Sequence, residues 1–235
     1  MRLDKFLAEV GLGSRKEVKQ LIKKGNVSVN QQIEKSDKCQ IDPAKDVVTF
    51  LGEDLTYQEF YYYLLHKPAG VVSATEDNRD RTVMDLFSPQ DLRSDLFPVG
   101  RLDKDTEGLL LITNDGKLAH ELLSPKKHVE KEYLAEVAGV MTTEDQEQFK
   151  KGVQLDGERT LPAELMIDET AQDTSLVRII LHEGKFHQVK RMVKICGKEV
   201  TYLKRIRMGA LSLPDDLAKG AYRALTKEEL QQIKG

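Results

Sequence analysis

The chain has 235 residues, of which 40% are hydrophobic and 32% are charged, and its formal net charge is −3. This apolar content is enough for a packed core, and the length suits one large domain or an ordinary domain beside a small one. The longest apolar run, Phe60 to Leu65, is far shorter than the ~20 residues of a membrane-spanning helix. The first residues lack the apolar stretch of a secretory signal. Two isolated cysteines, Cys39 and Cys196, argue against a disulfide framework or structural zinc, so we expect a cytoplasmic protein without membrane contact.

Positive charge is concentrated in two segments. Residues 1–24 carry seven basic and three acidic side chains, and residues 178–207 carry nine basic and two acidic side chains. The rest of the chain is therefore strongly acidic. Two basic blocks on an acidic body suggest a polyanion that is bound at two places. Ordinary solvated helix faces would give the same composition, which does not decide between the two interpretations.

The N-terminal segment predicts two short helices and a small sheet. Apolar side chains recur at i, i+3, i+4 and i+7 over residues 3–10, which is the pattern of an amphipathic helix. Ser14 and Glu17 match the S-x-x-E capping box that starts a second helix. Alternating apolar residues over 26–30 and a strand-like run over 47–50 predict the sheet. Such a core is near the lower size limit for independent folding.

Residues 1–50 resemble the S4 RNA-binding domain. The resemblance is carried by RLDKFL from Arg2, GSRKE from Gly13 and IKKGNVSVN from Ile22. It implies that a basic helix face contacts RNA phosphates, which position a nucleic acid without reading its bases. The alternative is a plain scaffold of two helices. The residues expected to bind RNA here are Arg2, Lys5, Arg15, Lys16, Lys19 and Lys23.

The remainder predicts a larger α+β domain. Strand-like and helical segments alternate without a regular βαβ repeat, which favours a mixed, largely antiparallel sheet with flanking helices. We expect an S4-like domain over residues 1–51, a linker over 52–58 and a catalytic domain over 59–235. Strands are predicted at 61–65, 109–112, 131–137 and 175–181, helices at 118–123, 145–151 and 187–195, and a hairpin-type turn at Asn114-Asp115-Gly116.

A dense polar loop, residues 99–108, directly precedes the apolar run 109–112. Asp103 and Asp105 are two residues apart, so in an extended segment both would face the same side, as in a metal site or an acid–base pair. A charged turn, capped by Asp105 and Thr106, is the simpler alternative. The chain lacks the glycine-rich dinucleotide motif, the P-loop, HExxH and the nucleophile elbow. Nothing therefore indicates a nucleotide cofactor, zinc or an acyl-enzyme.

A second chemically rich segment covers residues 183–192. Its sequence, EGKFHQVKRM, combines an aromatic ring, hydrogen-bonding groups and cations within ten residues. Single-stranded RNA recognition uses this mixture. A basic surface helix without a ligand is the alternative.

Four motifs together resemble the RsuA-type RNA pseudouridine synthases. They are KPAG from Lys67, GRLDKDTEGLLLITNDG from Gly100, KEY from Lys131, and EGKFHQVKRM from Glu183. The resemblance spans essentially the whole chain, because many members carry an N-terminal S4 domain. It implies an enzyme that cleaves the uracil N1–C1′ bond, rotates the base and rejoins it through C5, without cofactor or metal. The small-subunit branch, which modifies uridine 516 of 16S ribosomal RNA, is the most similar.

The family resemblance also implies roles for individual residues. Asp103 is the essential carboxylate, and whether it attacks the sugar, attacks the base or removes a proton stays open. Tyr133 stacks on the flipped base, and Lys190 forms a salt bridge with Asp103. Arg101 contacts the RNA backbone or fills the gap left by the base, with a structural salt bridge as the alternative. Asp105 shapes the loop, and the further residues expected to bind RNA are His187, Gln188 and Arg191.

The expected partner is ribosomal RNA, either 16S RNA itself or a small-subunit assembly intermediate, and the expected state is a monomer. One alternative is a pseudouridine synthase acting on 23S RNA, because those relatives share the core motifs. Another is a non-catalytic S4-type assembly factor, which the loop around Asp103 argues against. A glycoside hydrolase is disfavoured because a convincing second carboxylate is missing.

Overall fold

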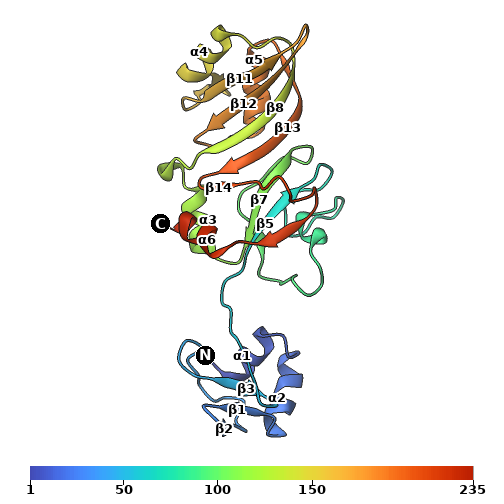
Figure 1. Ribbon diagram of the computed structural model, residues 1–235, viewed down its shortest axis with the longest axis vertical. Coiled ribbons are helices and arrows are strands. Elements are labelled where there is room, and N and C mark those ends of the chain that lie inside the picture. Colours follow the sequence, from blue (N-terminus) through green and yellow to red (C-terminus); the bar gives the residue numbers. More distant parts are fainter. Residues whose placement is uncertain (235) are drawn as a thin grey trace. The chain divides into compact units, whose positions relative to one another are not determined.

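The computed structural model describes residues 1–234, and the chain divides into two compact units, Met1–Glu59 and Phe60–Gly235. Both units combine helices with sheets, which confirms the expected α+β class (Figure 1). Among the described helices, none has the length and apolar character needed to cross a membrane.

The first unit packs two helices against a four-stranded sheet. Leu3, Phe6 and Leu7 of the first helix are fully buried, as are Val18 and Ile22 of the second. The elements are α1 (Leu3–Glu9), α2 (Arg15–Lys23), β1 (Val27–Val29), β2 (Gln32–Ile33), β3 (Val48–Phe50) and β4 (Glu53–Asp54), with sheet order β2-β1-β3-β4. The predicted capping box is present, because the Ser14 side chain accepts from the Glu17 amide and the Glu17 side chain accepts from the Ser14 amide.

The structure differs from the linker expected over residues 52–58. Glu53 and Asp54 form β4 and pair with Phe50 and Thr49 of β3. The Tyr57 hydroxyl then donates to the Glu9 carboxylate at 2.8 Å. This segment therefore belongs largely to the first unit, since strand pairing with β3 overrides its polar, linker-like composition.

The second unit is built on a mixed nine-stranded sheet. Its main order is β11-β12-β8-β13-β7-β5-β15, and within residues 1–234 only the β13–β7 pair is parallel. The sheet strands are β5 (Tyr62–Lys67), β6 (Phe97–Pro98), β7 (Glu107–Thr113), β8 (Lys131–Ala138), β11 (Glu164–Thr170), β12 (Thr174–Leu181), β13 (Glu199–Met208), β14 (Leu211–Ser212) and β15 (Tyr222–Ala224). The helices are α3 (Gly116–Leu123), α4 (Thr143–Lys151), α5 (Gln188–Ile195) and α6 (Lys227–Lys234), with a small hairpin of β9 (Gln154–Leu155) and β10 (Glu158–Arg159).

The two halves of this sheet are covered differently. β5 and β7 are buried along their whole length. One face of these two strands packs against helices α3 and α6, and the other belongs to the hydrophobic core that also includes side chains of α4 and α5 (Figure 1). In β8 and β12 every second residue is buried, on the face that packs against α4 and α5. Burial on both faces explains why β7 reads as a continuous apolar run.

The hairpin-type turn predicted at residues 114–116 is wrong. Asp115 is the N-cap of α3, and its carboxylate accepts a hydrogen bond from the Leu118 amide at 3.0 Å. The Tyr62 hydroxyl donates to the same carboxylate at 2.7 Å. An Asp-Gly pair suits both a turn and a helix start, and here the amphipathic segment that follows selects the helix.

The parallel contact between β7 and β13 requires a glycine. Gly108 has φ +111° and pairs with Arg205 of β13. A Cβ atom at this position would lie 2.2 Å from the Arg205 carbonyl oxygen, far inside van der Waals contact. The Arg205 guanidinium also crosses to β7, where Nε donates to the Leu109 carbonyl at 2.8 Å.

A buried ammonium group fixes the loop before β7. Lys67 lies at the end of β5 with no exposed surface. Its Nζ donates to the carbonyl oxygens of Pro68, Asp103, Lys104 and Thr106, at 3.0, 3.0, 3.3 and 2.8 Å. Burial lowers the pKa of Lys67 to about 8, partly offset by the nearby carboxylates of Asp105 and Asp103. The backbone around Asp103 is thus held from the core side.

We expect Gly108→Ala to lower the free energy of unfolding of the second unit by about 3 kcal/mol or more, because its backbone cannot move away from β13. Gly116→Ala is the matched control, since that glycine begins α3 and has nothing within 4 Å of the added Cβ. Its effect should stay within about 1 kcal/mol. Urea titrations of the two variants compare them directly, and equal stabilities would contradict the close approach.

Lys67 also predicts a pH dependence. A lysine whose folded pKa lies below its unfolded value binds fewer protons when folded, so folding is opposed below pH 8 and this opposition disappears as the pH rises towards 10.5. The stability of the wild type relative to Lys67→Met should therefore increase between pH 8 and pH 10. Urea titrations at both pH values measure it, with Lys126→Met, an exposed lysine, as control. A constant difference would contradict the lowered pKa.

Candidate active site

A cavity of about 690 Å³ opens beside the loop that contains Asp103. Its walls come from that loop, from β8 and β13, and from residues 182–187 between β12 and α5. Asp103, Tyr133, Arg101 and His187 all line it, and the same four line a smaller adjoining pocket of about 80 Å³. The residues predicted from distant motifs therefore meet in one place.

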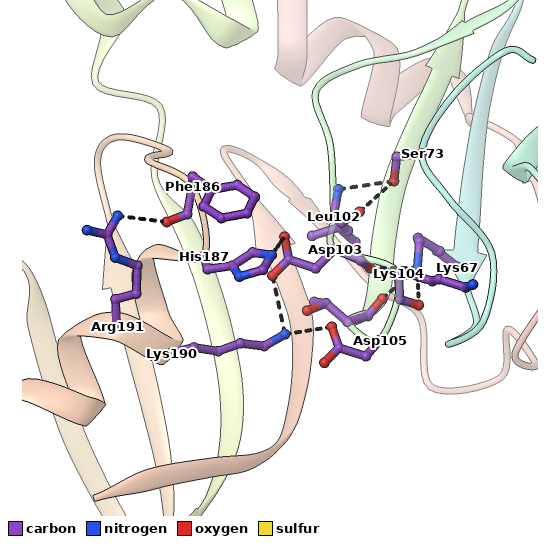
Figure 2. A network of polar contacts seen from close by, with 11 residues as sticks. Lys67, Ser73, Leu102, Asp103, Lys104, Asp105, Phe186, His187, Lys190 and Arg191 are labelled. Carbon is purple, nitrogen blue, oxygen red and sulfur yellow. Dashed lines mark hydrogen bonds and ion pairs between the residues drawn. The ribbon is translucent and has the colours of Figure 1, made fainter. Parts of the chain in front are cut away.

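The position of Asp103 is set by its backbone neighbours. Lys67 holds its carbonyl oxygen, as described above. On the other side, the Ser73 hydroxyl donates to the Leu102 carbonyl at 3.0 Å and accepts from the Leu102 amide at 3.1 Å (Figure 2). The Asp103 side chain is 26% exposed, so its carboxylate stays accessible to a ligand while its backbone is fixed.

Lys190 of α5 contacts two carboxylates of the loop. Its Nζ lies 3.3 Å from Asp103 Oδ2 and 2.6 Å from Asp105 Oδ1 (Figure 2). The expected pairing with Asp103 is present, and the shorter contact goes to Asp105, whose pKa is lowered by its hydrogen bond with Lys190. His187 Nε2 adds a third contact, 3.4 Å from Asp103 Oδ1.

The two aspartate carboxylates are therefore bridged by the Lys190 ammonium group, where the sequence had suggested a metal site or an acid–base pair. Both Asp103 and Asp105 reach the same side of the loop, as their spacing predicted, and Lys190 occupies the position between them. Within residues 1–234, no group of three or more His, Cys, Asp or Glu side chains is arranged to hold a metal ion.

The turn before α5 presents an aromatic pair at the cavity. His187 has φ +47°, and this left-handed conformation starts the helix at Gln188 while the imidazole faces Asp103. The Phe186 ring stacks on that imidazole, with centroids 3.8 Å apart, and is 72% exposed. Arg191 steadies the turn by donating to the Phe186 carbonyl at 3.2 Å (Figure 2).

Gln188 differs from the expectation that it contacts RNA. Its side chain is buried, with Nε2 donating to Glu183 Oε1 at 2.8 Å and Oε1 accepting from the Lys185 amide at 2.8 Å. The amide group therefore stabilises the turn from inside. It begins an amphipathic helix whose inward face continues with Val189 and Met192, so it lies on the core side.

Tyr133 and Arg101 both line the cavity beside Asp103. Tyr133 is 8% exposed, and its hydroxyl forms no hydrogen bond with any residue from 1 to 234. Arg101 is exposed and forms no salt bridge within the described chain, so the structural salt bridge considered for it is not found. Both side chains are free to contact a ligand.

Sequence reasoning missed four residues that shape the site. Lys67 and Ser73 position the loop, and Lys131 and Arg205 line the cavity with buried side chains. A signal was available for three of them, because a lysine or arginine on the buried side of an apolar strand needs a specific partner. Ser73 carried no such signal.

The basic residues predicted in the first unit fall into two groups. Arg2 and Lys19 form ion pairs with Asp4 and Asp37, and Lys5 pairs with Glu9. The others are exposed and form no ion pair within residues 1–234; they are Arg15, Lys16 and Lys23, which we call the α2 basic face.

Comparisons with known proteins agree with this geometry. Residues 61–194 match the RNA pseudouridylate synthase family, and residues 1–47 match the S4 domain. The uncharacterized RNA pseudouridine synthase YtzG of Bacillus subtilis (strain 168) is 50% identical over 99% of this chain and 98% of its own length. The ribosomal small subunit pseudouridine synthase A of Vibrio cholerae is 42% identical, covering 99% of both chains.

A solved structure shows the same fold. The crystal structure of a pseudouridylate synthase superposes with a TM-score of 0.69 at 36% identity, covering 99% of both chains. The family match, the relatives that align over the full length and the residues gathered around Asp103 therefore all support the same family assignment. This chain belongs to the RNA pseudouridylate synthase family and carries an N-terminal S4 domain.

Proposed function

We propose that this enzyme converts a uridine of ribosomal RNA to pseudouridine, and that its target is uridine 516 of 16S RNA. The observation that carries the reaction is the position of Asp103, on a loop held by Lys67 and lining one cavity together with Tyr133. The small-subunit name of the Vibrio cholerae relative supports the 16S substrate.

The arrangement suits an extruded nucleotide. Tyr133 offers an aromatic face to replace the stacking that a flipped base loses. Asp103 provides the essential carboxylate beside it, and Lys190 supplies the neighbouring cation. Arg101, which is exposed at the cavity, contacts the RNA backbone or enters the space that the base leaves. The family resemblance implies that these side chains act without a cofactor.

A second candidate substrate is 23S RNA. The ribosomal large subunit pseudouridine synthase B of Bacillus subtilis is 36% identical over 99% of this chain and 95% of its own length. A non-catalytic S4-type assembly factor is disfavoured, because it would have no use for the clamped Asp103 loop. With either substrate, we expect a monomer that acts in the cytoplasm on ribosomal RNA or on an assembly intermediate.

Asp103→Asn should abolish pseudouridine formation and leave RNA binding intact, because it removes the carboxylate charge with almost no change of shape. Pseudouridine mapping of 16S and 23S RNA, in cells without the gene that express wild type or variant, measures the effect. Wild type should restore one site and Asp103→Asn should not. Turnover near wild type in the variant would exclude Asp103, and a site restored in 23S RNA would exclude the 16S substrate.

The α2 basic face should bind RNA. Reversing it with Arg15→Glu, Lys16→Glu and Lys23→Glu should weaken affinity for the substrate RNA and reduce the slope of log affinity against log salt by about 0.7 to 0.9 for each lost phosphate contact. The matched control reverses three exposed lysines of the same unit, Lys35, Lys38 and Lys45. Binding titrations at several salt concentrations compare the two triple variants. Equal losses would show that only net charge matters.

A further inference from the structure

Two cations lie side by side with Tyr133 on one face of the sheet. Arg205 of β13 is the cross-strand partner of Tyr133, and Lys131 is two residues before Tyr133 on β8. Paired residues and residues two apart point to the same face of a sheet. All three side chains line the cavity of about 690 Å³ that Asp103 faces.

Both cations are buried and neither has an ion-pair partner in direct contact within residues 1–234. Lys131 is 9% exposed and Arg205 is 2% exposed, and within residues 1–234 neither forms a salt bridge. Lys131 Nζ donates to the Val129 carbonyl at 3.1 Å. Arg205 Nη2 is buried without a hydrogen-bond partner in the described chain. The charge of the Glu183 carboxylate acts to raise the pKa of Lys131. This carboxylate accepts hydrogen bonds from the Leu161 backbone amide and from the Gln188 side chain.

Such a pair is costly unless an anion completes it. Burial lowers the pKa of Lys131, and the neighbouring Arg205 charge lowers it further. Lys131 donates one hydrogen bond, to the Val129 carbonyl, and Arg205 donates one, to the Leu109 carbonyl. The remaining N–H groups of both side chains are available to a ligand. The cavity therefore contains two buried cations that form no salt bridge within the described chain, although the Glu183 charge acts on Lys131.

We propose that Lys131 and Arg205 form an anion subsite that binds a phosphodiester of the RNA strand beside the flipped uridine. RNA brings one negative charge per phosphate, whereas its bases are neutral, so the phosphate is the group that two cations select. Tyr133, on the same face, is left to contact the base. This inference rests on the proposed function, because it assigns a further part of the same site.

The subsite can be tested with a short single-stranded oligouridine, labelled for fluorescence anisotropy. Versions of this RNA each carry one uncharged methylphosphonate linkage. At one linkage the wild type should lose affinity about tenfold, the cost of a charge-assisted hydrogen bond. Lys131→Met should bind the unmodified RNA more weakly than the wild type does. The methylphosphonate at that linkage should then reduce the affinity of the variant little further, because the substitution and the methylphosphonate remove the same contact.

Two variants complete the cycle. Lys131→Arg keeps the charge and should keep the methylphosphonate penalty, which shows that a loss in Lys131→Met is not misfolding. Lys126→Met removes an equal charge from an exposed lysine that does not line the cavity, and it should keep the wild-type penalty. Equal penalties in wild type and Lys131→Met at every linkage would overturn the proposal. So would unchanged affinity of Lys131→Met together with slower isomerisation, which would place the cation at the base.

The outcome is independent of the reaction. Oligouridine binding requires no isomerisation, so coupling between Lys131 and one linkage would support the subsite even if ribosomal RNA mapping rejected the proposed function. Conversely, a mapped pseudouridine without such coupling would keep the enzyme and remove the phosphate from Lys131 and Arg205.

Discussion

The site depends on one buried ammonium group. Lys67 ends strand β5, which is buried along its whole length, and its Nζ donates to carbonyl oxygens of Pro68 and of the loop from Asp103 to Thr106. The backbone of the loop is therefore tied to a fully buried strand of the sheet. The carboxylate of Asp103 contacts Lys190 and His187 and stays partly exposed at the cavity.

The opposite wall of the cavity belongs to the other half of the sheet. Tyr133 and Arg205 come from strands β8 and β13, and His187 and Lys190 come from the start of α5. The two halves join where β7 runs parallel to β13, at a contact that admits only Gly108. The strand that follows the Asp103 loop is thus joined directly to the strand that carries Arg205.

Much of this could be predicted from the sequence, because local patterns report local structure. Apolar periodicity identified α1 and α5, and the S-x-x-E motif located the start of α2. The continuous apolar run after the polar loop identified β7 as a buried strand. The motif resemblance predicted the contact between Asp103 and Lys190, although 87 residues separate them in the chain.

The rest depended on contacts between distant segments. Glu53 and Asp54 have the composition of a linker, and they form a strand because they pair with β3. Asp115 is typical of a turn, and it caps a helix because α3 follows it. Gln188 has the composition of an RNA contact and turns inward because Glu183 offers an acceptor there. Pairing partners of this kind are set by tertiary packing, which no short window of sequence contains.

The Lys190 ammonium group contacts two carboxylates, those of Asp103 and Asp105, so it has a second anionic partner besides Asp103. If Asp103 is the reacting carboxylate, as proposed, its oxygen gains a proton or a bond to carbon in each of the steps considered, and its charge is then lost. Asp105, the nearer of the two partners, remains ionised beside the ammonium group at that moment. In the proposed reaction, Lys190 therefore keeps one carboxylate partner while the Asp103 charge is absent and has two again once Asp103 is released.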